Sequence, residues 1–204
     1  IEVHGIPLDQ LQVLLGEYET VALIGKSFGV LRWFESGIDW SLPRTDSSGR
    51  KPQVTINPHL AIADALRRRD LTMNAMALNV HTGELVDPFG GLADITKKIL
   101  RAPDIKFFPE DPLRFYRVLQ FAARFGMTPD AELRAVCAGM DLRGVAQERV
   151  ADEYDKLMLQ ADTPSVGFRV LEQIGRLAEL LPELAALATT PQDSRWHPEG
   201  DVLE

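Results

Sequence analysis

The sequence contains one cysteine, no long apolar run and no excess of basic residues, and each shortage excludes a class of protein. A single cysteine, Cys137, cannot form an internal disulfide framework or a cysteine-based zinc site. Without an apolar run of about 18 residues, no membrane span is expected. The start of the sequence also lacks the pattern of a secretory signal, so we expect a cytoplasmic protein.

The charge balance is acidic, with 30 acidic against 22 basic residues and a net charge of -8. This balance excludes a uniformly basic nucleic-acid-binding domain. It does not exclude RNA binding, because basic residues cluster in Arg67–Arg69 and again along residues 114–124. A positive groove can therefore form locally on an acidic protein.

Residues 109–126 are predicted to contain a largely buried helix that nevertheless carries charges. Asp111 followed by Pro112 is typical of a helix start, and Gly126 of a helix end. Apolar side chains cover most of the circumference of this helix, which indicates burial. They are Leu113, Phe115, Tyr116, Val118, Leu119, Phe121, Ala122 and Phe125.

Arginines occupy the remaining face of this helix. Arg114 and Arg117 lie three residues apart, and Arg124 follows on the same side. Because an unpaired buried charge is very costly, these guanidinium groups need phosphates, base edges or protein carboxylates as partners. Two interpretations stay open: the arginines bind a nucleotide, or they form a structural ion-pair network in which Asp111 only caps the helix.

The 204 residues divide into a strand-rich first part and a helical second part. The first part is predicted to hold a helix at 8–17 and strands at 1–6, 21–24, 30–34, 37–42, 76–80 and 84–86. Residues 45–59 lack periodicity and are expected to form an irregular surface loop. Further helices are predicted at 92–99, 129–140, 147–160, 164–174 and 176–187.

Two polar features of the first part invite a functional interpretation. Asp39 is a lone carboxylate in an apolar strand, so it is either an exposed edge residue or a group that holds a metal or a positive charge. Lys26 and Ser27 lie in a glycine-flanked loop that does not have Walker A spacing, and they form either a plain turn or the edge of a substrate site.

A denser polar cluster follows Arg67–Arg69. Asp70, Thr72 and Asn74 would share one face if the backbone is extended here. Carboxylate, hydroxyl and amide groups in this arrangement suit recognition of a ribose and phosphates. The alternative is a capping network at a helix-to-strand junction.

Three ordered motifs resemble those of a known family. Arg68–Ala75, Asp87–Leu92 with Leu100 and Arg101, and Glu110–Arg117 are similar to consecutive motifs of the class II tRNA nucleotidyltransferases and bacterial poly(A) polymerases. These proteins belong to the superfamily of DNA polymerase beta-like nucleotidyltransferases. The resemblance extends over nearly the whole chain, as far as Trp196–Asp201.

The resemblance implies an α+β fold with three regions. Residues 1–91 would form a partial nucleotidyltransferase head with a mixed sheet, and residues 92–145 a helical neck that carries the nucleobase-reading helix. Residues 146–204 would begin a helical body that leads towards a possible HD domain.

The resemblance also implies how a nucleotide is bound. Arg69, Asp70 and Asn74 would contact the phosphates and the ribose of the incoming nucleotide.

A separate set would read the base. Asp111 and Arg114 would pair with the Watson–Crick edge of ATP or CTP, and Arg117 would support the base or the phosphates. A carboxylate accepts from the exocyclic amine that both bases carry, while a guanidinium donates to a ring nitrogen or a carbonyl oxygen. GTP and UTP would leave the carboxylate unpaired, at a cost of about 1 to 3 kcal/mol.

The implied activity is transfer of CMP and/or AMP from CTP and ATP to the 3' end of tRNA, with loss of pyrophosphate. It depends on Mg2+, whose family ligands, an Asp-x-Asp pair, are expected before Ile1. The 204 residues alone are therefore expected to be inactive, with Asp39 as a third acidic group near the catalytic centre. Poly(A) polymerase and a catalytically inactive nucleotide- or RNA-binding module are the alternatives.

Gln120 departs from the family pattern, which often has a third arginine at this position of the helix. The departure leaves the choice among CCA, CC, A and poly(A) addition open, and Arg124 is able to replace the missing contact only in part.

Overall fold

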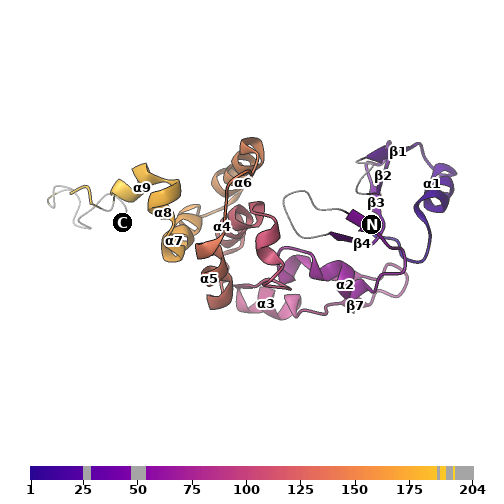
Figure 1. Ribbon diagram of the computed structural model, residues 1–204, viewed down its shortest axis with the longest axis horizontal. Coiled ribbons are helices and arrows are strands. Elements are labelled where there is room, and N and C mark those ends of the chain that lie inside the picture. The colour runs from indigo at the N-terminus through magenta and orange to yellow at the C-terminus, as the bar shows by residue number, and fades with distance from the viewer. Residues whose placement is uncertain (25–28, 47–53, 188, 192–194, 196–204) are drawn as a thin grey trace.

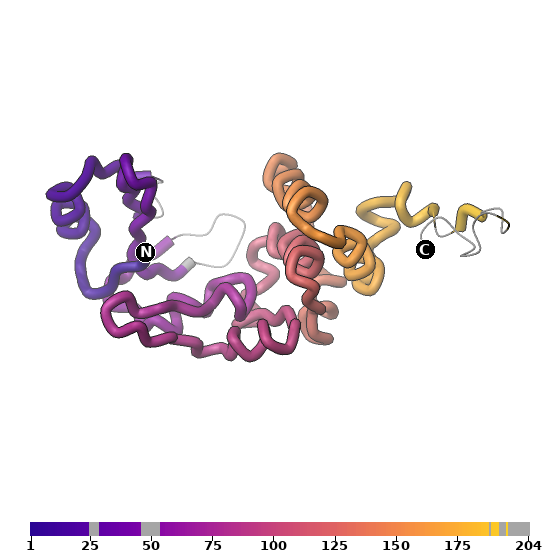
Figure 2. Tube along the Cα trace, turned by 180° about the vertical axis from the view of Figure 1, so that it is seen from behind, coloured from indigo at the N-terminus to yellow at the C-terminus, as the bar shows by residue number. Residues whose placement is uncertain are grey.

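The chain is elongated, with its strand-rich N-terminal part at one end and its helical part at the other (Figure 1). The computed structural model describes residues 1–204 apart from 25–28, 47–53, 188, 192–194 and 196–204. The loop at Lys26 and Ser27 and the motif Trp196–Asp201 lie outside the described residues. Figure 2 shows residues 60–100, in magenta, running between the two ends along one side of the molecule.

The N-terminal end contains a helix packed beside a small antiparallel sheet. Leucines at helical spacing and short alternating runs form these elements, and Leu11, Leu15, Leu31 and Leu42 form their core. The strand order is β1-β2-β3, and residue Glu2 adds a parallel bridge to Ser41 on β3. The elements are α1 (Leu8–Gly16), β1 (Val21–Ile24), β2 (Val30–Trp33) and β3 (Asp39–Ser41).

The expectation of an irregular loop at residues 45–59 is wrong at both of its ends. β4 (Arg44–Asp46) and β5 (Val54–Ile56) pair as antiparallel strands, with Thr45 opposite Thr55. Each strand is only three residues long, so neither shows a periodic pattern in the sequence. Their pairing to each other, rather than local sequence, defines them. Residues 47–53 lie outside the described part of the chain.

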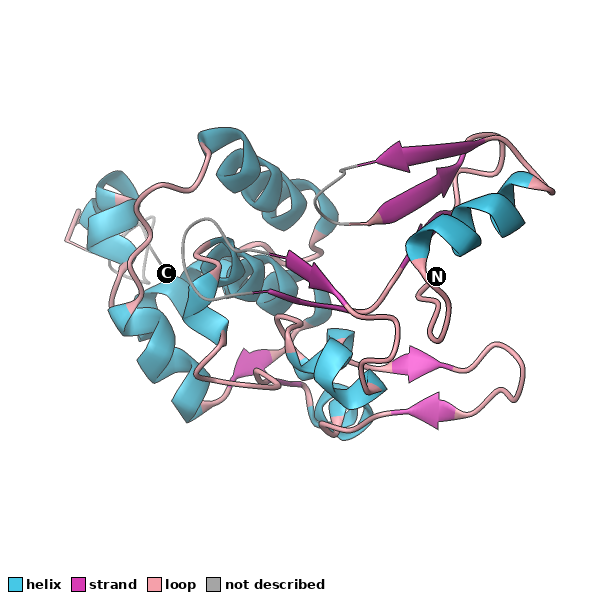
Figure 3. Cartoon of the chain, turned by 45° about the vertical axis from the view of Figure 1, so that its right-hand side comes forward, coloured by secondary structure: helices cyan, strands magenta, loops and turns pink. Residues whose placement is uncertain are grey.

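The segment between the two ends of the molecule forms short helices and strands (Figure 3). The backbone there is not extended, as a shared face of Asp70, Thr72 and Asn74 would require, because Thr72–Asn74 forms a turn of 3-10 helix. β8 (Ile99–Leu100) pairs in parallel with β9 (Thr128–Pro129), so the strand pairings of the chain are both antiparallel and parallel. The elements of this segment are α2 (Ile62–Arg67), η1 (Thr72–Asn74), β6 (Ala77–Leu78), β7 (Leu85–Val86), α3 (Gly91–Lys97), β8 and η2 (Phe108–Glu110), and β9 comes later in the chain.

The second part is helical and is organised around α4 (Leu113–Phe125), which packs against α6 and α7. Gly126 ends α4 in the left-handed conformation that glycine adopts without strain, at φ 59°. The helix predicted at 176–187 is instead two helices, because Pro182 has no backbone N–H to continue the first one. The remaining helices are α5 (Ala131–Gly139), α6 (Gln147–Gln160), α7 (Ser165–Ile174), α8 (Leu177–Leu180) and α9 (Pro182–Leu187).

The structure confirms the predicted fold class, an α+β head followed by helices. The larger core surrounds α4 and is separate from the small N-terminal core. No helix in the described part of the chain is both long and apolar enough to span a membrane.

Candidate nucleotide-binding site

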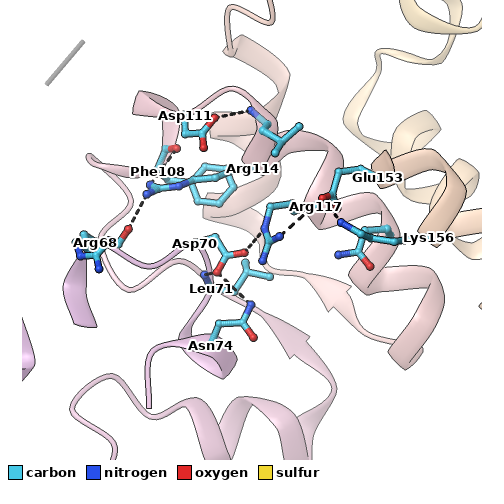
Figure 4. A network of polar contacts seen from close by, with 12 residues as sticks. Arg68, Asp70, Leu71, Asn74, Phe108, Asp111, Arg114, Arg117, Glu153 and Lys156 are labelled. Atoms are coloured by element: carbon cyan, nitrogen blue, oxygen red, sulfur yellow. Dashed lines mark hydrogen bonds and ion pairs between the residues drawn. The ribbon is translucent and has the colours of Figure 1, made fainter. Parts of the chain in front are cut away.

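Three segments that are far apart in the sequence meet at one place: the stretch after α2, the first turns of α4 and the middle of α6 (Figure 4). Most of the side chains predicted to bind a nucleotide lie here. Asp70 and Asn74 come from the first segment, and Asp111, Arg114 and Arg117 from the second. The spacing along one segment brings Asp111, Arg114 and Arg117 together. The tertiary fold brings Asp70 and Asn74 next to them.

Asp70 is the central acceptor of this site. Its Oδ1 accepts hydrogen bonds from the backbone N–H of Leu71 at 2.8 Å and from Nδ2 of Asn74 at 3.1 Å. Its Oδ2 accepts from Nε of Arg117 at 2.6 Å. The carboxylate is buried, so these bonds are of the strong, charge-assisted kind. Asp70 therefore fixes Arg117 and Asn74 in place.

Arg114 is held by main-chain oxygens. Its Nη2 donates to the carbonyl of Arg68 at 2.6 Å, and its Nη1 donates to the carbonyl of Phe107 at 2.9 Å. The guanidinium also lies over the Phe107 ring, 5.1 Å from the ring centre. Contacts to two separate segments fix the plane of the guanidinium and tie α4 to the head.

Asp111 divides its two oxygens between two tasks. Oδ1 accepts a hydrogen bond from the backbone N–H of Leu113 at 3.0 Å, as expected of a residue that caps the start of α4. Oδ2 lies 3.5 Å from Nη2 of Arg149 on α6, and the Asp111 side chain is 42% exposed. The capping interpretation and the base-reading interpretation are therefore compatible, because they use different oxygens.

Arg69 differs from the other arginines of the motif. It is exposed, and its guanidinium makes no hydrogen bond or ion pair within residues 1–195 as far as these are described. An exposed cation beside a buried acidic network suits contact with an anion from solution.

Asp39 is not part of this cluster. It lies on β3, where its Oδ1 and Oδ2 accept from Nε and Nη2 of Arg32 at 2.6 and 2.8 Å. These hydrogen bonds hold the pKa of Asp39 below its usual value. No three His, Cys, Asp or Glu side chains come together among the described residues.

Gln120 and Arg124 contact each other within α4. Gln120 is buried, and its Oε1 accepts from Nη1 of Arg124 at 3.1 Å. Arg124 also lies over the ring of Phe125 at 5.2 Å. Arg124 is thus held by contacts within its own helix, about two turns away from Arg117.

The sequence interpretation missed two buried carboxylates. Asp94 on α3 accepts from the hydroxyl of Thr72 at 2.7 Å and pairs with Arg101 at 3.4 Å, which fixes η1 against α3. Glu153 on α6 lies 3.8 Å from Nη1 of Arg117 and accepts from Nζ of Lys156 at 2.7 Å. The signal in the sequence that could have revealed them is a charged residue at a helix position where an apolar residue is expected.

Two family models match parts of this chain. The family model described as "Poly A polymerase head domain" matches residues 31–101. The model described as "Probable RNA and SrmB- binding site of polymerase A" matches residues 129–187.

Curated relatives match over most of the chain. A multifunctional CCA protein of Stenotrophomonas maltophilia (strain K279a) is 37% identical over 91% of this chain and 48% of its own length. One of Shewanella denitrificans is 44% identical over 88% of this chain and 45% of its own length. The chain therefore spans about half the length of the curated relatives it matches.

Solved structures share the fold. Apo form II of a CCA-adding enzyme matches with a TM-score of 0.70 at 25% identity, over 89% of this chain and 45% of that one. The Thermotoga maritima CCA-adding enzyme complexed with tRNA matches with a TM-score of 0.65 at 24% identity, over 89% of this chain and 43% of that one. From its sequence relatives and its fold together, this chain belongs to the class II CCA-adding enzyme family.

Proposed function

We propose that this chain is the nucleotide-selecting part of a tRNA nucleotidyltransferase. The intact protein would add CMP and/or AMP from CTP and ATP to the 3' end of tRNA, giving a complete or partial CCA end and releasing pyrophosphate. The observation that carries the proposal is that Arg114 and Arg117 on α4, and Asp111 just before it, are held next to the segment that bears Arg69 and Asp70.

Base selection follows from the donors and acceptors of α4. Oδ2 of Asp111 would accept from the exocyclic amine of adenine or cytosine, and Arg114 would donate to the adjacent ring nitrogen or carbonyl oxygen. Guanine and uracil present no amine there, so the carboxylate would lose a hydrogen bond worth about 1 to 3 kcal/mol. Because the contacts of Arg114 fix its plane before any ligand arrives, little ordering cost would accompany binding.

The phosphates and the ribose of the nucleotide would contact the head. Arg69 would contact the phosphates, for which its exposed guanidinium is suited, and Asp70 with Asn74 would lie towards the ribose. Arg117, fixed by Asp70, would support the base or the phosphates.

Catalysis needs more than the described residues supply. Mg2+ would activate the primer hydroxyl and neutralise the triphosphate in the intact protein. Since the described residues form no acidic cluster, its ligands would lie elsewhere in that protein, with Asp39 as an additional acidic group. We expect the protein to act in the cytoplasm, with a head at 1–91, a neck at 92–145 and a body from 146.

Poly(A) polymerase is the second candidate, because the matching head model carries that description. The two activities share the site and differ in when addition stops. A nucleotide-binding module without catalysis is the third candidate.

One experiment separates these candidates. The full-length protein is incubated with Mg2+, a tRNA that lacks its 3' CCA and each labelled nucleotide, and product lengths are read on a sequencing gel. Addition that stops after one to three nucleotides, with ATP and CTP only, supports the proposal. Continued addition of AMP supports poly(A) polymerase, and nucleotide binding without incorporation supports the binding module.

A further inference from the structure

Glu153 is a buried carboxylate on the inward face of α6. Its neighbours on this face are Val150 and Leu157, the position is one where an apolar residue would pack, and the side chain is only 3% exposed. Oε1 accepts from Nζ of Lys156 at 2.7 Å. Oε2 is buried and accepts no hydrogen bond from the part of the chain that the structure describes.

Stability alone does not account for a carboxylate at this position. An incompletely satisfied buried charge destabilises the folded protein, whereas a hydrophobic residue of similar volume is often neutral or stabilising. Its single ion pair within α6, to Lys156, would form as well on the surface of the helix.

The contact that requires burial is the one to Arg117. Nη1 of Arg117 lies 3.8 Å from Oε1 of Glu153, while Nε of the same guanidinium donates to Asp70 at 2.6 Å. The guanidinium also lies over the Phe121 ring, 5.0 Å from the ring centre. Arg117 is therefore fixed from the head on one side and from α6 on the other (Figure 4).

We propose that Glu153 is a positioning residue that sets the direction of the Arg117 guanidinium, so that α6 takes part in nucleotide selection. This inference rests on the proposed function, in which Arg117 supports the base or the phosphates. A guanidinium is planar, and attachment at two of its nitrogens stops it from turning about its own axis. With Glu153 gone, Asp70 alone would leave Arg117 free to turn.

The charges of the cluster are balanced by this arrangement. Asp70 and Glu153 carry two negative charges, and Arg117 and Lys156 carry two positive ones. Neutralising Glu153 would leave Lys156 and Arg117 close together without the carboxylate that they share. Both effects would weaken nucleotide binding through Arg117 rather than through a direct contact.

The test compares Glu153→Gln with Glu148→Gln in the full-length protein. Glu148 lies on the same helix, is exposed and undergoes the same chemical change. Dissociation constants for ATP and CTP are measured by calorimetry, alone and in an Arg117→Ala background. We expect Glu153→Gln to weaken the binding of both nucleotides about tenfold, since Arg117 loses a charged partner. Glu148→Gln is expected to change neither by more than about twofold.

The Arg117→Ala background decides the mechanism. If Glu153 acts through Arg117, the Glu153→Gln effect on nucleotide affinity disappears there. An equal effect in both backgrounds, or no effect in the wild type, would overturn the proposal. If Glu153→Gln fails to unfold cooperatively, Glu153→Asp is used instead, because it keeps the charge and withdraws it by one methylene.

The proposed function is judged separately by Arg114→Ala. Loss of affinity with Arg114→Ala but not with Glu153→Gln removes only the role of Glu153. Unchanged affinity in both variants removes the base-reading site itself.

Discussion

At the scale of single residues, the arginines of α4 are held by contacts that the sequence does not reveal. Arg114 donates to the main-chain carbonyls of Arg68 and Phe107. Neither the ion-pair interpretation nor the nucleotide interpretation includes these two contacts. Arg117 follows the ion-pair interpretation, because Asp70 and Glu153 flank it. These carboxylates orient a guanidinium that nonetheless stays partly exposed.

The Arg114 contacts lead to a prediction for Arg114→Ala. The variant should bind ATP and CTP about tenfold or more weakly, and its free energy of unfolding should fall by about 1 to 3 kcal/mol because partly buried carbonyls lose a charged donor. Calorimetry and urea unfolding measure the two effects. Arg143→Ala is the control, since Arg143 is highly exposed and should change either quantity little. Unchanged ATP affinity in Arg114→Ala would favour a purely structural arginine.

Cys137 gives a second prediction at this scale. Burial raises the pKa of its thiol from 9.0 to about 12, so the folded protein keeps it protonated. A thiol reagent at pH 8 should leave it unmodified until urea unfolds the chain. Because the unfolded thiol ionises first, the free energy of unfolding should fall as the pH rises above 9.0. Rapid labelling of the native protein would contradict the prediction.

At the scale of elements, α4 shows how far periodicity reaches. Its apolar residues are buried as predicted, except that Phe125 at the last turn is 39% exposed. The helix ends at Gly126, as its sequence indicates. Periodicity does not determine the backbone of Asp70 to Asn74, where Thr72–Asn74 forms a 3-10 turn and Thr72 donates a hydrogen bond to Asp94 on α3.

The close approach of α3 to this turn predicts the effect of Gly91→Ala. A Cβ at Gly91 would lie 2.2 Å from the carbonyl oxygen of Thr72, which is backbone and cannot move aside alone. The variant should lose about 1 to 3 kcal/mol of unfolding free energy, measured by urea denaturation. Gly139→Ala is the matched control at the end of α5, where nothing lies within 4 Å of the added atom. The control should be neutral or gain about 0.5 to 1 kcal/mol, and equal losses in both would refute the steric explanation.

At the scale of the whole molecule, two hydrophobic cores lie at different places along the chain. The small one joins α1 to the three-stranded sheet through four leucines, and the large one surrounds α4. A core of four buried side chains opens at lower free energy than one built on a central helix.

Hydrogen exchange should resolve the two cores. In the 204-residue chain, amides of α1 and β1 should exchange well before those of α4, since the small core can open without the large one. Mass spectrometry of exchanged peptides measures the order. Simultaneous exchange of both regions would mean that they unfold as one unit.

The sequence by itself determined most helices of the second part, the ends of α4 and the polar motifs, because periodicity, capping and chemical type are local properties. The motif resemblance gave the family, which the comparisons confirm. Only the tertiary structure decided that Asp70 meets Arg117 across 47 positions and that Glu153 reaches the same guanidinium from α6. Those pairings depend on how three segments that are far apart in the sequence pack together. The residue spacing within a single segment does not determine how close it comes to the other two.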